Sequence, residues 1–360
     1  MSGALNGVCP YFTMFPLSFP QGILKRYAVS GETVLDPFAG RGTTLYAARC
    51  RGMKAYGVDS NPVAIAISEA KLANATPKNI VVEAESILSE LKAPASLPSG
   101  EFWEWAFSAS VLNVLCRFRE SFTEDCRSDA RKALRAIILG ALHGPLGKKI
   151  HSYFSNQCPR TYAPKPRYAL NFWKARNLFP PKVDVIRLIQ RRAERFYSEE
   201  RTIAHGQAIL GDSQQRCAFD VVNTEVSWVI TSPPYYGLRT YTPDQWLRNW
   251  FLGGPAGVDY SSVGQLPHSS RDEFCAGLRK VWQNCAAVSK PGCRMVIRFG
   301  SINDRQIDAL AMIKNSLADT LWRIVTCRNA GSALHGRRQA DHFVRARMPI
   351  TEYDIWTVKR

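Results

Sequence analysis

Short apolar runs, separated by turn-forming residues, mark the two ends of the chain. Residues 33–35 and 55–58 have the composition of buried strands, and residues 63–71 have the apolar spacing of a helix. After residue 205 the same alternation of strands and helices is predicted, at 228–230, 274–288, 290–299 (a turn and a strand), 304–318, 321–327 and 353–358. Strands that alternate with helices are typical of an α/β fold with a largely parallel sheet.

The middle of the chain has a different pattern. After a start punctuated by proline and glycine, helical spacing is predicted at 101–119, 125–142 and 182–198. We therefore predict one domain made of residues 1–75 and 205–360, with residues 76–204 as a helical insertion.

Composition limits the class of protein. The chain has 360 residues, 46% of them apolar, so a large core is expected. Ten cysteines occur without a C-x-x-C pair, which argues against a zinc ribbon or a disulfide framework and favours free thiols in a reducing cytoplasm. The sequence contains neither a signal-peptide pattern nor an apolar run of membrane-spanning length. The net charge of +17 favours a polyanionic partner, most simply nucleic acid.

One predicted strand, 228–230, ends abruptly at two prolines. Ser232, Pro233, Pro234 and Tyr235 follow it, so a hydroxyl, a stiff carbonyl-bearing corner and an aromatic ring are presented together. Such a set suits a planar base with an exocyclic amine, because Ser232 and the Pro233 carbonyl can accept the amine hydrogens while Tyr235 stacks on the ring. A plain strand stop is the alternative for this motif taken alone.

A second motif follows the strand at 33–35. Asp36 ends that strand, and Gly40 and Gly42 lead into a helix that begins near Thr43. Glycines let a ligand approach the backbone, and the amides at a helix N-terminus favour a carboxylate. A dinucleotide site is less favoured because the third glycine of G-x-G-x-x-G is absent. Farther on, Asp59 ends a second strand, where doubly wound folds bind ribose hydroxyls.

Together these motifs resemble the DNA amino-methyltransferases, which transfer a methyl group from S-adenosylmethionine to N4 of cytosine or N6 of adenine. The resemblance covers residues 30–72 and 209–300, and residues 12–27 more weakly. It implies an α/β, Rossmann-like seven-stranded methyltransferase sheet with a large, mainly helical, basic insertion. The catalytic residues would be Ser232, Pro233, Pro234 and Tyr235.

The resemblance also implies a set of cofactor-binding residues. Asp36 would accept from the methionine ammonium, Asp59 would bind the ribose, and Asp212 would lie near the adenine amine, although an Asx-turn is the alternative for Asp212. The full set is Asp36, Pro37, Phe38, Gly40, Gly42, Thr43, Asp59, Ser60, Asn61 and Asp212, with Phe15 and Phe19 as weaker candidates that could instead pack on the core.

The insertion is the predicted target-recognition region. Residues 145–201 contain thirteen Lys and Arg against four Asp and Glu, interleaved with aromatics, which suits phosphate contacts and base stacking. The expected partner is double-stranded DNA, with a cognate restriction endonuclease as a candidate second partner and neither a membrane nor a metal. A prokaryotic cytoplasm, near the nucleoid, is the expected location. The DNA-binding candidates are Arg160, Lys165, Arg167, Lys174, Arg239, Arg337 and Arg338.

The chemistry narrows the substrate. Methylation at carbon 5 would require a cysteine nucleophile, usually in a Pro-Cys dipeptide, which the sequence lacks. Serine at the first position of the tetrapeptide is commoner in N4-cytosine enzymes, so cytosine N4 in a flipped-out base is the first prediction and adenine N6 the second. An RNA or protein amine methyltransferase and an inactive DNA-binding module are the remaining alternatives.

Overall fold

The computed structural model describes residues 3–11, 15–147, 152–159, 164–199, 202–237, 243–260, 266–267, 270–300, 308–332 and 351–360. The chain divides into two compact units, each of which is discontinuous in sequence. One consists of residues 1–10, 69–201 and 240–261, and the other of residues 11–68, 202–239 and 262–360. We call them the helical unit and the sheet unit.

The sheet unit is built on a seven-stranded sheet of order β3-β2-β1-β4-β5-β7-β6. Neighbouring strands from β3 to β5 are paired in parallel, whereas β7 is antiparallel to both β5 and β6. This topology confirms the predicted α/β, Rossmann-like fold. The strands are β1 (Thr33–Asp36), β2 (Lys54–Asp59), β3 (His205–Leu210), β4 (Val226–Thr231), β5 (Ser289–Gly300), β6 (Trp322–Ser332) and β7 (Thr351–Lys359).

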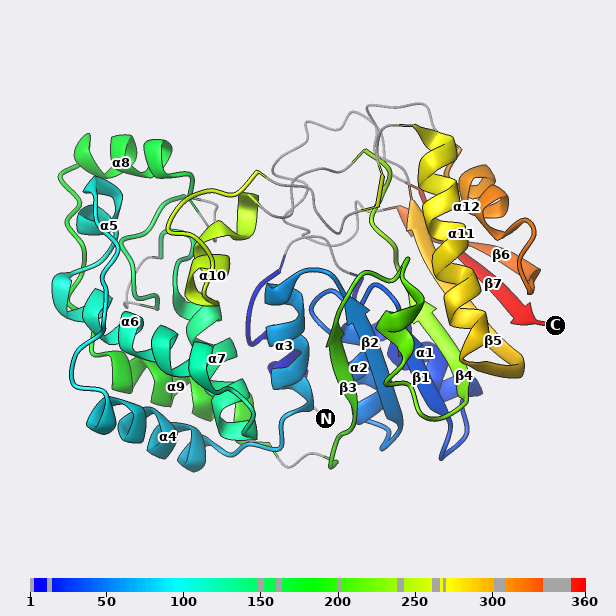
Figure 1. The fold of residues 1–360 in the computed structure, drawn as a ribbon, viewed down its shortest axis with the longest axis horizontal. Coiled ribbons are helices and arrows are strands. Elements are labelled where there is room, and N and C mark those ends of the chain that lie inside the picture. Colours follow the sequence, from blue (N-terminus) through cyan, green and yellow to red (C-terminus); the bar gives the residue numbers. More distant parts are fainter. Residues whose placement is uncertain are drawn as a thin grey trace. The chain divides into compact units, whose positions relative to one another are not determined.

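Helices cover both faces of this sheet. In Figure 1, α11 (Arg271–Ala287) crosses in front of the strands, whereas α1 (Ser18–Tyr27) and α2 (Thr43–Arg49) lie behind them. The helix α12 (Ala309–Leu317) packs against α11 and β5. Because both faces are covered, β1 and β4 are buried along their whole length, as expected for a parallel sheet. The order of the strands reverses between β1 and β4, the place where open α/β sheets bind ligands.

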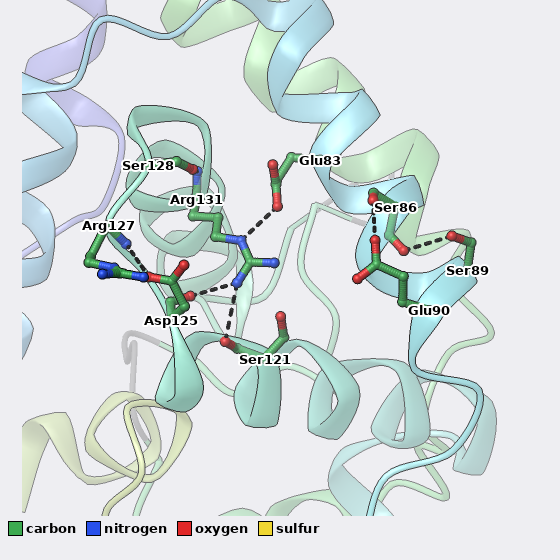
Figure 2. A network of polar contacts seen from close by, with 9 residues as sticks. All are labelled: Glu83, Ser86, Ser89, Glu90, Ser121, Asp125, Arg127, Ser128 and Arg131. Carbon is green, nitrogen blue, oxygen red and sulfur yellow. Dashed lines mark hydrogen bonds and ion pairs between the residues drawn. The ribbon is translucent and has the colours of Figure 1, made fainter.

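The helical unit contains most of the predicted insertion. Its helices are α4 (Pro77–Glu90), α5 (Glu101–Ala106), α6 (Ala109–Glu124), α7 (Asp129–Ala141), α8 (Pro166–Lys174), α9 (Val185–Tyr197) and α10 (Trp246–Phe251); α3 (Pro62–Leu72) crosses the boundary between the units. Polar contacts hold three of these helices together in Figure 2, where Arg131 of α7 bonds to Glu83 of α4 at 2.7 Å and to the carbonyl of Asp125, after α6, at 2.8 Å.

Two segments that the sequence assigned to the catalytic domain cluster with the helices, residues 1–10 and 240–261. The buried side chain of Arg248 explains part of this arrangement. It donates to the carbonyl of Pro10 at 2.7 Å and to that of Leu139 at 3.2 Å, so it ties the N-terminal segment to α7 and α10.

Several helices and strands begin or end at other residues than the sequence predicted. The helix expected at 101–119 is two helices, because Phe107 and Ser108 are extended. A further helix, α4, begins at Pro77, where proline is favoured at the first helical position, and the side chains of Thr76 and Asn79 cap it reciprocally. The strand expected at 321–327 continues to Ser332 because it pairs with β7 along that length.

Candidate active site

The two motifs singled out in the sequence meet at one edge of the sheet. β1 and β4 are adjacent parallel strands, with Leu35 opposite Val229, so both end at the same edge. The hydroxyl of Thr231, the last residue of β4, donates to Asp36 Oδ1 at 2.6 Å. Ser232 follows directly and is half-buried. A contact between residues 195 positions apart therefore joins the acid of the first motif to the start of the second.

Asp36 is completely buried, and its two oxygens have different surroundings. Oδ1 accepts from Thr231 and from the amide of Phe38 at 3.1 Å. Oδ2 has no hydrogen-bond partner within the described part of the chain. Burial raises the pKa of Asp36 to about 6, while the hydrogen bonds from Thr231 and the Phe38 amide act in the opposite direction. A cationic donor that reached Oδ2 would therefore be stabilised strongly.

The turn after β1 depends on two glycines. Gly40 and Gly42 have φ angles of 50° and 70°, in the left-handed region. A Cβ at Gly42 would lie 2.6 Å from the hydroxyl oxygen of Ser68. That hydroxyl donates to the carbonyl of Gly40 at 3.1 Å, so α3 holds the turn in place. Thr43, which begins α2, is buried directly after the turn.

Asp59 joins the end of β2 to the same turn. Its Oδ2 accepts from the amide of Gly40 at 2.8 Å and its Oδ1 from the amide of Asn61 at 2.9 Å. Burial raises the pKa of Asp59, and these two amides oppose the rise. Asn61 in turn accepts from the amide of Val63 at 2.9 Å and donates to the hydroxyl of Tyr11 at 3.1 Å, whereas Ser60 is exposed. The acid and its neighbours therefore organise the loop between β2 and α3.

The end of β3 lies beside that loop. The amide of Gly211 donates to the carbonyl of Asp59 at 3.0 Å. Asp212 accepts from the amide of Gln214 at 2.9 Å, so it forms an Asx-turn, and its side chain is half-buried. Ser213 donates to the carbonyl of Pro37, which ties this turn to the one after β1. The Asx-turn that was the alternative for Asp212 is therefore present. The carboxylate of Asp212 also lies at the edge of the sheet where β1 and β2 end.

The rest of the proline motif is held by the last strands of the sheet. Pro233 is buried and Pro234 half-buried. The hydroxyl of Tyr235 donates to Glu352 Oε1 on β7 at 2.7 Å. Its ring meets that of Phe299 edge to face, with the two ring centroids 5.3 Å apart. The motif is therefore anchored at its aromatic end.

The aromatic candidates lie in packed positions. Phe19, in α1, is buried under the guanidinium of Arg298, which lies 3.8 Å from the ring centroid. Arg298 is held by Asp354 through two bonds of 2.8 Å. Phe15 is half-buried and meets Phe19 edge to face at 5.2 Å. Phe38 meets Trp282 of α11 in the same way at 6.2 Å, so each of these rings is fixed by a neighbour.

The basic candidates fall into two groups. Arg160, Arg239, Arg337 and Arg338 lie outside the described residues. Lys165, Arg167 and Lys174 are exposed at or within α8 of the helical unit. Lys174 pairs with Glu101, and Lys165 lies 5.9 Å from the ring of Tyr260.

Sequence reasoning missed four residues that shape the edge: Thr231, Ser68, Gly300 and Glu352. Thr231 directly precedes the proline motif and could have been included on that ground. The other three have no local signal, because each acts on a residue that is distant in the sequence. Within the described ranges we find no cluster of His, Cys, Asp and Glu suited to a metal ion. No helix there has the length and apolar character needed to span a membrane.

Comparison with known sequences points to one family. Residues 4–70 match the DNA methylase family of the N6 and N4 type. The type II methyltransferase M.MjaII of Methanocaldococcus jannaschii is 35% identical over 68 residues, which cover 19% of this chain and 13% of that protein. Both matches support the DNA amino-methyltransferase family and confirm the resemblance, although the chain matches only a small part of the relative's length.

Some solved structures are remotely similar to this chain. The rRNA methyltransferase AviRa of Streptomyces viridochromogenes has a TM-score of 0.39 and 12% identity, over 99% of this chain and 90% of its own. An rRNA methylase from Streptococcus thermophilus has a TM-score of 0.36 and 9% identity, over 97% and 98%. These values are too low to support a statement about substrate.

Proposed function

We propose, starting from the match of residues 4–70 to the DNA methylase family of the N6 and N4 type, that this chain is a site-specific DNA methyltransferase. It transfers the methyl group of S-adenosylmethionine to N4 of a cytosine that has been flipped out of the double helix. Adenine N6 is the second candidate, because the same set of groups can hold either exocyclic amine.

One observation carries the proposal, the hydrogen bond between Thr231 and Asp36. It places the proline corner and the buried acid at one edge of the sheet, although they are far apart in the sequence. In-line transfer between a bound donor and a base requires the two sites to be contiguous, since positioning supplies much of the rate enhancement. Separate locations for the two motifs would have excluded the reaction.

The residues at this edge fit S-adenosylmethionine. The unpartnered Oδ2 of Asp36 would accept from the α-ammonium, and the glycine turn leaves room for the carboxylate beside the backbone. Asp59 retains lone pairs for the ribose hydroxyls, since each of its oxygens accepts one amide hydrogen bond within the described part of the chain. Asp212 would lie near the adenine amine. The bound donor supplies an electrophilic methyl group, and the chain supplies its orientation.

The proline corner would hold the acceptor amine. An aromatic exocyclic amine is a poor nucleophile because its lone pair is delocalised into the ring. Ser232 Oγ and the Pro233 carbonyl would accept its two hydrogens, which turns the lone pair out of the ring plane, and Tyr235 would stack on the base. These fixed acceptors act as a preorganised field for the displacement.

The helical unit offers a surface for DNA around α8. Trp105 and the 70% exposed Phe179 are stacked at 5.3 Å, with Lys174 6.0 Å from the Trp105 ring. Tyr168 and Phe172 are stacked at 6.3 Å, with Arg176 4.2 Å from the Phe172 ring. Each pair has one exposed ring, in Phe179 and in Tyr168, beside a cation, which suits contacts to both bases and phosphates.

The test is transfer of labelled methyl from S-adenosylmethionine to plasmid DNA, followed by mass spectrometry of the nucleosides. We expect N4-methylcytosine from the parent chain and none from Ser232→Ala. Detection of N6-methyladenine instead would make adenine N6 the target. Labelling of RNA or protein in place of DNA, or of nothing, would contradict the proposal.

A restriction endonuclease of the same specificity is the partner we propose for a site-specific enzyme of this kind. The modified plasmid would then resist digestion at the methylated sequence. Digestion of methylated and unmodified plasmid with endonucleases that recognise the mapped site tests this, and equal cleavage of both would contradict it.

A further inference from the structure

β7 brings a buried acid to the edge where the proline motif lies. It is the one antiparallel neighbour of β5 among the described strands, with Gly300 opposite Glu352. β5 runs parallel to β4, so the end of β5 and the start of β7 lie at the edge where β4 ends. Glu352, the second residue of β7, is thereby placed next to a motif 117 residues earlier in the chain.

Glu352 is 4% exposed, and its Oε1 accepts the hydroxyl of Tyr235 at 2.7 Å. A hydroxyl that donates to a carboxylate makes a charge-assisted hydrogen bond, stronger than one between neutral groups. Phe299 provides a second restraint, because its ring meets that of Tyr235 at an interplanar angle of 75°. The phenol is therefore fixed at its tip by an acid and along its ring by an aromatic edge.

The third participant is a glycine. A Cβ at Gly300 would lie 3.3 Å from Tyr235 Oη and 3.2 Å from Glu352 Cγ. Both distances are shorter than ordinary van der Waals contact, so a side chain here would press on both partners. The absence of a Cβ keeps open the space in which phenol and carboxylate meet.

We propose that Glu352 is a positioning residue for Tyr235, with Gly300 as the residue that admits the contact. The inference rests on the proposed methyl transfer. A ring that stacks on an extruded base must be held at a set place before the base arrives, because ordering it afterwards would consume part of the binding energy. The carboxylate holds the phenol at the edge of the sheet and leaves the acceptor groups of Ser232 and Pro233 to the amine.

The proposal predicts coupling between two side chains. Tyr235→Phe keeps the ring and removes the donor, whereas Glu352→Met removes the acceptor with little change in length. Each is expected to lower kcat for methyl transfer roughly tenfold, the effect of losing one hydrogen bond to a charged group. The double variant is expected to be no slower than either single variant, and the dissociation constant of S-adenosylmethionine is expected to stay unchanged.

Two further variants separate positioning from mere folding. Glu352→Gln keeps an acceptor oxygen and should recover most of the lost rate. Gly300→Ala keeps both partners but crowds them, and should lower kcat as the single variants do. Thr357→Val is the matched control, because it removes a buried hydroxyl bond elsewhere on β7 and should leave kcat unchanged.

Losses that multiply in the double variant, parent-like rates in both single variants, or a parallel loss of cofactor affinity would each overturn the positioning role. Those results leave the proposed function standing, because the parent chain still transfers methyl groups. An inactive parent chain would overturn both. The melting temperature of every variant, measured beside the kinetics, shows whether a lost rate reflects unfolding.

Discussion

Asp36 changes its charge within the pH range in which the proposed methyl transfer would be assayed. Its pKa is raised by burial to about 6, and only the charged form attracts an ammonium. We expect the affinity for S-adenosylmethionine to be constant above pH 7 and to fall about tenfold per pH unit well below pH 6. Calorimetry from pH 5 to 8 measures this.

Asp36→Asn is the control for that profile, since it should bind weakly at every pH. The contribution of Asp36 to folding stability depends on pH in the opposite direction to its contribution to cofactor affinity. The folded chain holds this proton to a higher pH than the unfolded chain, so the stabilising contribution is complete below about pH 4 and is lost as the pH rises through 6. An affinity profile in Asp36→Asn identical to that of the parent would contradict the assignment.

His143, in the helical unit, makes the folding stability depend on pH with the opposite sign to Asp36. Its ring is buried, its Nδ1 lies 2.7 Å from Ser155 Oγ, and burial lowers its pKa to about 3. The unfolded chain takes up a proton near pH 6.5 and the folded chain does not, so stability should fall by up to about 1.4 kcal/mol per pH unit below 6.5. Urea unfolding of the parent and His143→Gln between pH 7 and 5 tests this, and equal slopes for the two chains would contradict it.

The turn between β1 and α2 is the element on which the proposed cofactor site depends. Alanine at Gly42 would have an unfavourable positive φ and a Cβ overlapping Ser68. We expect Gly42→Ala to lower the free energy of unfolding by about 1–3 kcal/mol and to weaken S-adenosylmethionine binding. Urea unfolding and calorimetry measure the two effects.

Gly31→Ala is a matched control for Gly42→Ala. Gly31 also has a positive φ, 85°, but nothing lies within 4 Å of its Cβ position. The Gly31→Ala variant should therefore have the backbone strain without the overlap of a Cβ with another side chain. We expect it to bind S-adenosylmethionine as the parent does. Equal loss of cofactor affinity in both variants would show that the overlap with Ser68 is not what matters.

The whole molecule carries a net charge of +17, and its described cations on α8 are exposed. If they contact phosphates, DNA affinity depends steeply on salt. Lys165→Ala combined with Arg167→Ala should reduce the slope of log K against log salt by up to about 2. Fluorescence anisotropy with a labelled duplex measures this slope between about 50 and 300 mM salt.

A charge-matched double variant controls for net charge. Lys280 and Lys314 are exposed on α11 and α12 of the sheet unit. Their replacement by alanine removes the same charge and should leave the slope within about 0.5 of the parent value. An equal reduction in both double variants would indicate that overall charge, rather than α8, controls binding.

Elements that depend on neighbouring residues could be predicted from the sequence. Alternating apolar runs predicted the α/β sheet, and strand ends marked by Asp36, Asp59 and Ser232 predicted the candidate site. These signals are readable because a strand, its stop and its turn involve neighbouring residues. The helical insertion was also predicted from periodicity, but the break at Phe107 was not. The start of α4 at Pro77 was missed because proline both ends and begins helices.

Contacts between residues that are distant in the sequence could be read only from the folded chain. The bond from Thr231 to Asp36 follows from the order of β1 and β4, and that from Tyr235 to Glu352 from the antiparallel insertion of β7. Residues 1–10 and 240–261 likewise lie in the helical unit, where the buried side chain of Arg248 donates to the carbonyl of Pro10. Such contacts leave no periodic trace, because strand order is set by packing over the whole sheet rather than by any one stretch of the chain.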